Sequence, residues 1–500
     1  MNNSSMIYKI HPVKDLKLRK YAIIGFILVS FAGIVSFLWV PDISIVTPLL
    51  YAIYILITLY ILRFAKVDIF SPLMFFIFLS FLGFGFSLSY LSNFPDQFFF
   101  INPFYAYNFK YDSHTMALAF MVFLIGYISY IFGFNIVKRG IKLSIRERKT
   151  NIYTLIILGF ILIISSYLFR SRYHVGVPGY YTASIPHAGY LYYPLMYGSL
   201  IITGLILYSA LRKNSTFYTI IGLSLFGLDA ILKSILGWKG GPVQAIIIIL
   251  SIYYYTSRYS QQSISKNIKS SVIIMILILI IFLFLIYPIV TYYRSMVLIG
   301  GGQANLLNFV TIFKRSSNST GLNFTKALSK IQGRISGINN LLPIVAYFQQ
   351  NIGETIKTPS FFLNLLKIDI NPEQYYTWFV LGVNPKIITT NAPTGWGALY
   401  IYGGIIGVII GMFILGTISK FLYLTFLINL KRDGRWIVFY AMFICYIFIP
   451  VVFSGTIINY CRKNLLALII MYGSIIFILN IKPINKHIQK GYLKVQRRVI

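Results

Sequence analysis

Arginine and lysine side chains near the ends of several apolar segments could bind a phosphate or pyrophosphate group. Arg170 and Arg172 end one such segment, Arg294 follows another, and Lys239 lies in the glycine-rich turn 237–242. The arginine guanidinium is a planar fork of donors that can pair with two phosphate oxygens at once. The same side chains could instead contact ordinary lipid headgroups, and the sequence leaves both interpretations open for any single residue.

Further basic candidates lie in the long segment between residues 292 and 395, which includes Arg315 and Arg334. Around Arg334, in residues 322–342, apolar side chains recur every three or four positions, which predicts an amphipathic helix. Pro343 would end this helix or start a new one. The helix could lie flat on a membrane surface, or it could pack on the rest of the protein with a solvated basic face.

Histidine, glutamate and tyrosine side chains could supply acid–base chemistry and sugar contacts. His174, His187 and Glu354 are candidates for a general base that takes a proton from a hydroxyl group. Tyr180 and Tyr181 belong to a tyrosine-rich stretch whose rings could stack on sugar faces. Tyrosine is also common at membrane interfaces, and a histidine in a loop is more often merely polar.

Two patterns inside the apolar segments favour structural roles. Asp229 and Lys233 are four residues apart, so a helix would bring them together as an ion pair. Ionisable groups inside a membrane are functional candidates by default, but the simple ion pair is the interpretation that we favour slightly. Gly403, Gly407 and Gly411 have the spacing that lets helices approach closely, which predicts packing.

The elements that must position these residues are membrane-spanning helices. Hydrophobic residues make up 57% of the 500 residues and charged residues only 11%, whereas soluble domains carry about 25% charged residues. A spanning helix needs about 20 apolar residues. Such segments lie at 21–40, 44–62, 71–91, 115–137, 151–169, 190–211, 216–236, 242–257, 271–291, 396–419, 436–453 and 464–481. The sequence therefore predicts an all-α polytopic membrane protein with about twelve transmembrane helices.

The distribution of Lys and Arg predicts the orientation, because connections rich in these residues stay on the cytoplasmic side. Most of the 44 basic residues fall in alternate connections if the N-terminus is cytoplasmic, and twelve spans return the C-terminus to the same side. The net charge of +33 is then mainly a topology signal, and nucleic acid is not expected as a partner. We expect nine spans in residues 1–291, a large external loop at 292–395, and three spans with a cytoplasmic tail in 396–500.

Signatures of nucleotide and metal chemistry are lacking in the sequence. There is no P-loop, no dinucleotide fingerprint and no metal-ligand cluster, and Cys445 and Cys461 lack metal-ligand spacing. We therefore expect no cofactor and no metal. Any activated donor must be carried by the membrane.

The chain resembles the Wzy-type oligosaccharide repeat-unit polymerases, the O-antigen and capsule polymerases of bacteria. The resemblance is carried by residues 333–338 around Arg334, by the glycine-rich stretch 394–403, by the basic turn 238–240, and by the large, late external loop. It covers most of the chain at the level of architecture. One departure is Lys239, at a position where an arginine is expected.

The resemblance implies glycosyl transfer at the outer face of the bacterial inner membrane. A growing glycan leaves its undecaprenyl pyrophosphate carrier and joins the non-reducing end of an incoming lipid-linked repeat unit. Arg294 and Arg334 would stabilise the leaving pyrophosphate. The implied partners are the lipid-linked donor and acceptor, membrane lipids and a chain-length regulator protein.

Two other functions are compatible with this architecture. An O-antigen ligase would transfer the glycan to lipid A core. A lipid-linked oligosaccharide flippase would predict internal pseudo-symmetry and charges that line a central cavity. No clear internal repeat is visible, and the apolar segments are nearly free of charge, which disfavours the flippase.

The topology makes a direct prediction for cysteine labelling in intact cells. Single cysteines at Lys142 and Lys266 should react only with reagents that reach the cytoplasm, because both positions lie in basic connections. Cysteines at Asn318 and Glu373 should react with a reagent that cannot cross the membrane. Labelling of position 142 from outside would contradict the predicted topology.

Overall fold

The computed structural model describes residues 12–37, 44–64, 68–86, 113–143, 151–173, 188–238, 240–259, 264–300, 307–311, 337–350, 372–382, 393–454 and 465–480. Within these ranges every regular element is a helix, which confirms the prediction of an all-α protein. Among the described residues, seven helices are long and apolar enough to cross a membrane. The protein is therefore a membrane-embedded helical protein.

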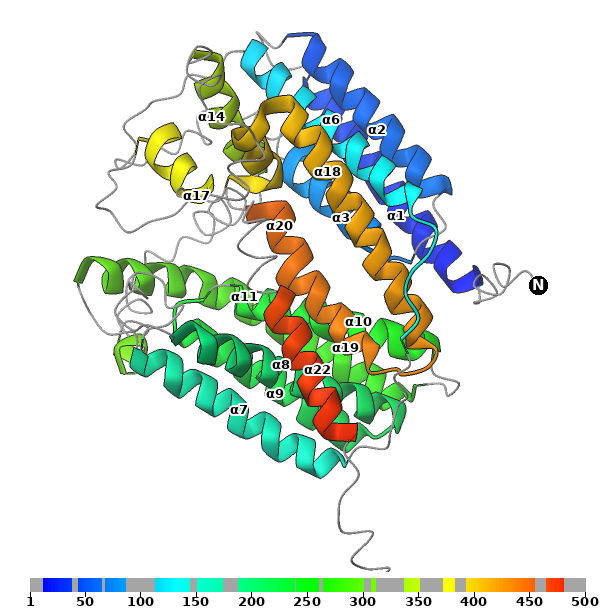
Figure 1. The fold of residues 1–500 in the computed structure, drawn as a ribbon, viewed down its shortest axis with the longest axis vertical. Coiled ribbons are helices and arrows are strands. Elements are labelled where there is room, and N and C mark those ends of the chain that lie inside the picture. The colour runs from blue at the N-terminus through cyan, green and yellow to red at the C-terminus, as the bar shows by residue number, and fades with distance from the viewer. Residues whose placement is uncertain are drawn as a thin grey trace, which may run out of the picture.

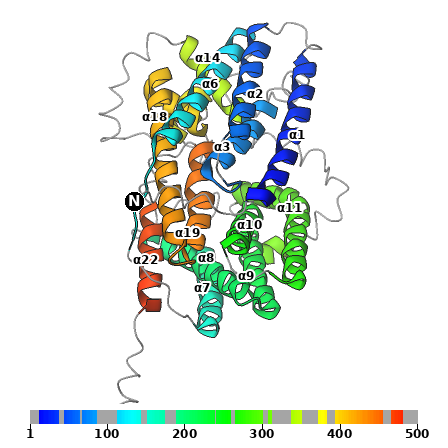
Figure 2. The ribbon, with the colours of Figure 1, turned by 90° about the vertical axis from the view of Figure 1, so that its right-hand side faces the viewer.

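One group of helices packs around α6 and fills the upper part of Figures 1 and 2. In this group α6 contacts α2, α14 and α18, and α1 contacts α2. The members are α1 (Pro12–Phe37), α2 (Val46–Phe64), α3 (Pro72–Ser80) with its π-helical continuation η2 (Phe81–Phe86), α6 (Ser113–Ile136), α14 (Gly337–Gln350) and α18 (Thr394–Leu430). The short helices α17 (Pro372–Tyr375) and η4 (Tyr376–Val380) lie beside α14 and α18.

A second group packs around α8, which contacts α7, α9, α10 and α22. Its members are α7 (Ile152–Tyr173), α8 (Ala188–Arg212), α9 (Thr216–Ile235), α10 (Gly241–Tyr259), α11 (Lys266–Gly300) and α22 (Leu466–Asn480). The continuous run of α19 (Trp436–Phe443), η5 (Ile444–Phe448) and α20 (Ile449–Ser454) joins the two groups. It does so because α19 contacts α8 and α10, while α20 contacts α18.

The described part of each of the twelve apolar segments falls on helices of this structure. The predicted boundaries of the long external loop differ from the helix ends, because α11 continues beyond residue 291 to Gly300 and α18 already begins at Thr394. Four apolar helices, at Ile23–Val35, Pro72–Gly85, Trp436–Val452 and Leu466–Phe477, are shorter than the seven long ones. The number of spans therefore remains a prediction.

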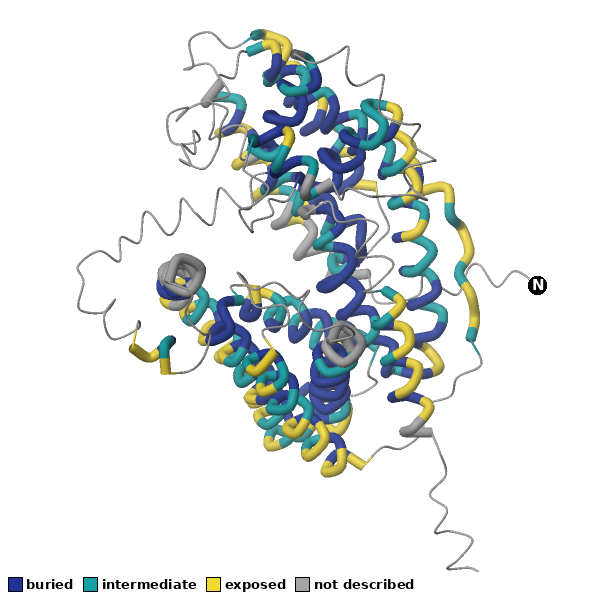
Figure 3. Tube along the Cα trace, turned by 60° about the vertical axis from the view of Figure 1, so that its left-hand side comes forward, coloured by how far each residue is buried: buried dark blue, intermediate teal, exposed yellow. Residues whose placement is uncertain are grey.

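Large apolar side chains cover the outward faces of the helices, which Figure 3 shows as exposed residues along their outer edges. On α11, for example, Ile274, Leu277, Ile278, Ile281 and Leu285 are all more than half exposed. A soluble protein rarely exposes such a continuous apolar surface. These faces are suited to contact lipid chains.

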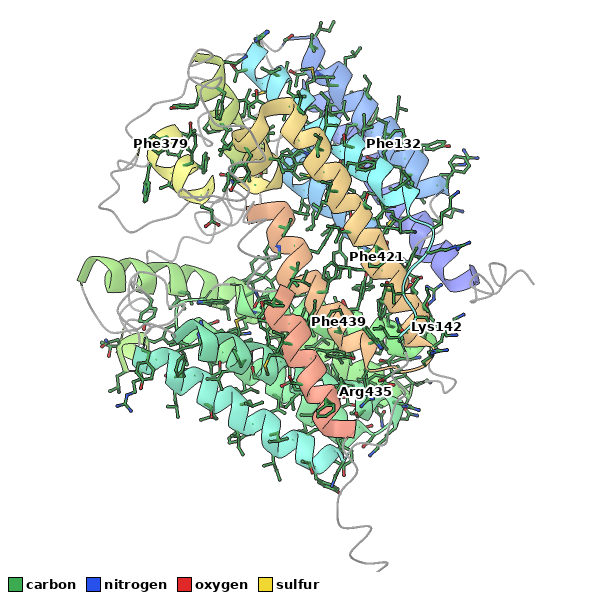
Figure 4. All side chains as sticks on the ribbon, in the orientation of Figure 1. Phe132, Lys142, Phe379, Phe421, Arg435 and Phe439 are labelled. Carbon is green, nitrogen blue, oxygen red and sulfur yellow. The ribbon has the colours of Figure 1, made fainter. Side chains whose placement is uncertain are left out.

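The connections rich in Lys and Arg meet at one end of the molecule, which we call the basic end. At this end the Arg258 guanidinium lies 2.9 Å from the Asp68 carboxylate, and the Tyr423 hydroxyl donates to the same carboxylate at 2.6 Å. These contacts join the connection between α2 and α3 to the ends of α10 and α18. Lys142 and Arg435 mark the basic end in Figure 4.

Two more hydrogen bonds bring the remaining basic connections to this end. The Leu143 amide, after α6, donates to the Asn429 side chain of α18 at 2.7 Å. The Ser265 amide, before α11, donates to the Asn214 side chain between α8 and α9 at 3.0 Å. Five connections that the sequence assigns to one side of the membrane are therefore together in space. We call the opposite end, where α7, α9 and α11 finish, the far end.

Helix α18 folds back on itself near the far end. Its backbone is broken at Gly403 and Gly404, and Gly404 has φ +57° and ψ −146°, a conformation that favours glycine. As a result Leu399 packs directly against Gly407 and Gly411. The expected role of these glycines in packing is correct, but Gly403 belongs to the break, and the partner is the preceding segment of the same helix. We call residues 394–402 the folded-back segment.

Most residues of the folded-back segment are buried. Trp396 is fully buried, and its indole N–H donates to the Phe123 carbonyl at 3.1 Å. Its ring stacks on Phe76, with the ring centroids 5.5 Å apart. Gly395 lies against the carbonyl oxygens of Val451 and Val452. Helices that precede the long loop in the sequence and helices that follow it therefore both enclose this segment.

Gly133 and Gly416 are points of close approach between α6 and α18. A Cβ on Gly133 would strike the Phe413 carbonyl oxygen, and one on Gly416 would strike the Tyr130 carbonyl oxygen. Since backbone cannot move aside as a flexible side chain can, we expect Gly133→Ala and Gly416→Ala to destabilise the protein by about 1–3 kcal/mol each. The melting temperature in detergent should fall accordingly. Gly25→Ala is the control, because its Cβ meets open space, and an equal fall there would contradict the prediction.

Candidate functional site

The structure describes only part of the site that the sequence predicts. Arg170 and Arg172 are described with their side chains, and Arg294 is described only by its place in α11. The other predicted site residues lie outside the described residues: His174, Tyr180, Tyr181, His187, Lys239, Arg315, Arg334 and Glu354. Their proposed roles stay predictions.

Arg170 is buried at the far end of α7, with only 2% of its surface exposed. Its guanidinium carbon lies 4.5 Å from the centre of a ring of Trp238, in the turn between α9 and α10. Cation–π attraction holds the guanidinium over this ring and so restricts where its donors can lie. Arg172 differs, because it is exposed and lies 5.7 Å over the ring of its own neighbour, Tyr173.

The turn that carries Trp238 is built directly on the end of α9. Gly237 has φ +84°, the left-handed conformation that commonly ends a helix. The Gly237 and Trp238 amides then donate to the carbonyls of Ser234 and Lys233, both at 2.9 Å. Gly241 packs against the Lys233 side chain, so α10 begins close beside α9. The position of Trp238 therefore depends on the last turn of α9.

A buried polar cluster, formed by Asp229, Lys233, Gln244 and Tyr446, lies within this part of the bundle. The Lys233 ammonium is 2.6 Å from the Asp229 carboxylate, which confirms the predicted ion pair. The ammonium also donates to the Tyr446 hydroxyl at 3.1 Å. The Tyr446 hydroxyl donates in turn to the Gln244 side-chain oxygen at 2.9 Å. A continuous chain of donors and acceptors thus links α9, η5 and α10.

Tyr446 and Gln244 of this cluster were not predicted from the sequence. Both are neutral residues in apolar segments, and Tyr446 is 213 positions from Lys233, so helical spacing gives no sign of the contact. Tyr446 lies in the π-helix η5, a rare conformation that is frequent at functional sites. Its ring also packs edge-on against Tyr197 of α8, at a centroid distance of 5.5 Å. The cluster therefore connects four helices.

The end of α11 lies beside this same part of the molecule. Val290 and Tyr293 of α11 pack in one apolar cluster with Leu236, directly after α9, and with Tyr167 of α7. Arg294 follows Tyr293 in the same helix. The helix turn that carries Arg294 therefore lies near the ends of α7 and α9, in the same corner as Arg170 and Trp238.

Helix α14 corrects one expectation about the long loop. Pro343 lies inside α14 and neither ends it nor starts a new helix. Ile338, Leu341, Leu342 and Val345 are fully buried in the main apolar core, and contacts with α6 and α18 hold the helix together despite the backbone hydrogen bond that proline removes. The described part of the predicted amphipathic region is therefore packed on the protein. Residues 322–336 lie outside the described residues.

Comparisons of the chain with protein-family models, with curated proteins and with solved structures find no match. Within the described ranges, no group of three His, Cys, Asp or Glu side chains could hold a metal ion. The arrangement offers instead a buried, oriented guanidinium beside a polar cluster, which is suited to bind an anion at the end of an apolar bundle.

The buried ion pair predicts a specific pattern in stability. Lys233→Met leaves the Asp229 carboxylate buried without its ammonium partner, and breaking a buried pair in this way costs about 3–5 kcal/mol. Adding Asp229→Leu removes the isolated charge and should restore much of that loss. The measurement is thermal unfolding of the wild type and the two purified variants in detergent. If the double variant is no more stable than Lys233→Met, the loss of stability does not come from an isolated Asp229 carboxylate, and the prediction is wrong.

Proposed function

We propose that this protein polymerises lipid-linked oligosaccharide repeat units by glycosyl transfer at the outer face of a bacterial inner membrane. The observation that supports this proposal best is the burial of Arg170 against Trp238 at the far end of the bundle. Its neighbours there are the helix turn that carries Arg294 and the turn that leads into Lys239. Such a group of basic residues suits a pyrophosphate joined to a membrane-embedded lipid.

The proposal includes twelve spans, a large external loop and two cytoplasmic termini. It is supported by the gathering of the basic connections at one end of the molecule, because cytoplasmic connections carry an excess of Lys and Arg. In this orientation the far end faces the outside. The region around Arg170 and Trp238, where the pyrophosphate would bind, and the segments around the long loop then lie on the same side of the membrane.

The proposed reaction needs little beyond positioning and charge stabilisation. An acceptor hydroxyl attacks the anomeric carbon of the growing glycan, and the bond from that carbon to the pyrophosphate oxygen breaks. The pyrophosphate leaves with the electron pair, and arginine donors stabilise its developing charge. The hydroxyl proton passes to a general base, for which His174, His187 and Glu354 remain the candidates. The donor already carries the energy for transfer, so no cofactor is required.

A deletion strain distinguishes this function from its two rivals. Loss of a polymerase leaves a single repeat unit on the lipopolysaccharide core. Loss of an O-antigen ligase leaves no repeat unit on the core. Loss of a flippase also leaves none, and lipid-linked units accumulate on the cytoplasmic side. The single-unit product is the expected result, and its absence would contradict the proposal.

Arg170 should be sensitive to shape as well as to charge. Arg170→Lys keeps the charge but loses the planar fork and its stacking on Trp238, and a charge-assisted hydrogen bond is worth about 1.5–3 kcal/mol. We therefore expect a reduction in polymerisation of about tenfold or more, and near inactivity for Arg170→Ala. The assay follows polymer made from purified lipid-linked repeat units in liposomes.

Arg63 provides the matched control for this test. It also lies over an aromatic ring, that of Phe64 at 5.4 Å, but it is exposed and sits at the opposite end of the molecule. Arg63→Ala should therefore leave polymerisation unchanged. Wild-type activity in both Arg170 variants, with normal protein levels in the membrane, would remove Arg170 from the proposed site.

A further inference from the structure

Aromatic side chains from three separate segments meet at the far end, away from Arg170. We call Phe348 of α14, Tyr375 of α17, Phe379 of η4 and Tyr400 of the folded-back segment the far-end aromatic cluster. Phe348 and Tyr375 lie parallel, with centroids 6.3 Å apart and an angle of 11°. Tyr400 meets Phe348 edge-on at 5.7 Å, and Phe379 lies 5.0 Å from Tyr375. Figure 1 shows α14, α17 and the start of α18 side by side.

The far-end aromatic cluster has a buried base and an accessible surface. Phe348 is only 8% exposed and is buried with Ile344, Val380 and Ile401 in a small apolar core. Tyr375 and Tyr400 are half-buried. Phe379 is 45% exposed and points away from the helices in Figure 4. Phe348 therefore anchors the cluster, while the other three rings remain partly accessible.

A carboxylate shares a short helix with one of these rings. Glu373 lies two positions before Tyr375 in α17, and it is half-buried. The Thr377 hydroxyl donates to the Glu373 carbonyl at 2.6 Å, which ties this turn to η4, the helix that carries Phe379. The carboxylate therefore comes from the same turn of chain as two of the rings.

This combination of groups has the chemistry of a carbohydrate site. The apolar C–H face of a sugar packs on an aromatic ring, whereas its hydroxyl groups need acceptors such as a carboxylate or a phenol oxygen. Binding sites commonly combine apolar rings with a few placed polar groups in this manner. An aromatic belt at a membrane interface would require the rings but no carboxylate among them.

We infer that the far-end aromatic cluster, together with Glu373, binds a sugar ring of the glycan substrate. This inference rests on the proposed function, since it assigns the sugar part of a substrate whose pyrophosphate would be bound near Arg170. The exposed ring of Phe379 and the half-buried ring of Tyr375 pack on the sugar face. Glu373 accepts hydrogen bonds from its hydroxyl groups.

A cationic ligand such as a quaternary ammonium is the main alternative for aromatic rings beside a carboxylate. One observation favours the sugar. The two rings that would meet the ligand, Tyr375 and Phe379, are tilted by only 32° from each other, and the ring that stands edge-on, Tyr400, does so against the buried Phe348. This arrangement offers a face for a sugar and not a cage around a cation.

The test measures binding without catalysis. The probe is the repeat-unit oligosaccharide released from its lipid carrier by mild acid, added to the full-length protein in nanodiscs and followed by isothermal titration calorimetry. We expect Glu373→Gln and Phe379→Ala each to weaken binding about tenfold, because each loses one principal contact. Phe132→Ala, which removes an exposed phenylalanine of α6, should bind as the wild type does.

The outcomes separate this inference from the proposed function. Unchanged affinity in both variants, no binding to the wild type, or displacement of the sugar by tetramethylammonium would overturn the inference. In the liposome assay the two variants should raise the KM for the repeat unit more than they lower kcat. Active polymerisation with unchanged KM would reject the sugar site alone. Sugar binding that depends on Glu373, in a protein that makes no polymer, would support the site and reject the polymerase.

Discussion

The absence of water from the bilayer interior is the constraint on which this architecture depends. Each backbone N–H and C=O group inside lipid must find a partner within the protein, which restricts exposed spanning segments to helices. Non-helical backbone is tolerated only where other parts of the protein surround it. The folded-back segment before the break at Gly403 and Gly404 is helical and is buried among α6, α14 and α20, whereas the two glycines of the break are half-buried near the far end.

The same constraint governs the charged groups. Asp68, Asp229 and Asp433 are buried, and each pairs with a basic side chain at less than 3 Å. Two of these pairs lie at the basic end, where the Asp68–Arg258 pair joins the connection after α2 to the end of α10 and the Asp433–Arg435 pair lies within the connection between α18 and α19. The Asp229 pair lies instead within the bundle, near the turn that presents Trp238 to Arg170. A structural ion pair and a proposed substrate contact are therefore parts of one continuous arrangement.

The long apolar helices could be predicted from the sequence because a helix that spans a membrane must be long enough and apolar enough to cross it. The gathering of the basic connections was also predictable, since Lys and Arg mark one side. The contact of Lys233 with Tyr446 was not, because a hydroxyl in an apolar helix gives no periodic signal. Nor was the packing of α14, since an apolar stripe fits a membrane surface and a protein surface equally well. The fold-back at Gly403 was not predictable either, because glycines spaced four residues apart favour close packing against any segment, including an earlier part of the same helix.

The enclosure of Gly395 by Val451 and Val452 also has a consequence for biosynthesis. A ribosome makes residues 394–402 before it makes α20. The residues that cover this segment are therefore not yet all present when the segment first reaches the membrane. Its cover arrives only after most of the C-terminal part of the chain has been translated. Maturation of the far end is therefore a late, post-insertion event, and a truncation before residue 451 would leave Trp396 and its neighbours without one wall.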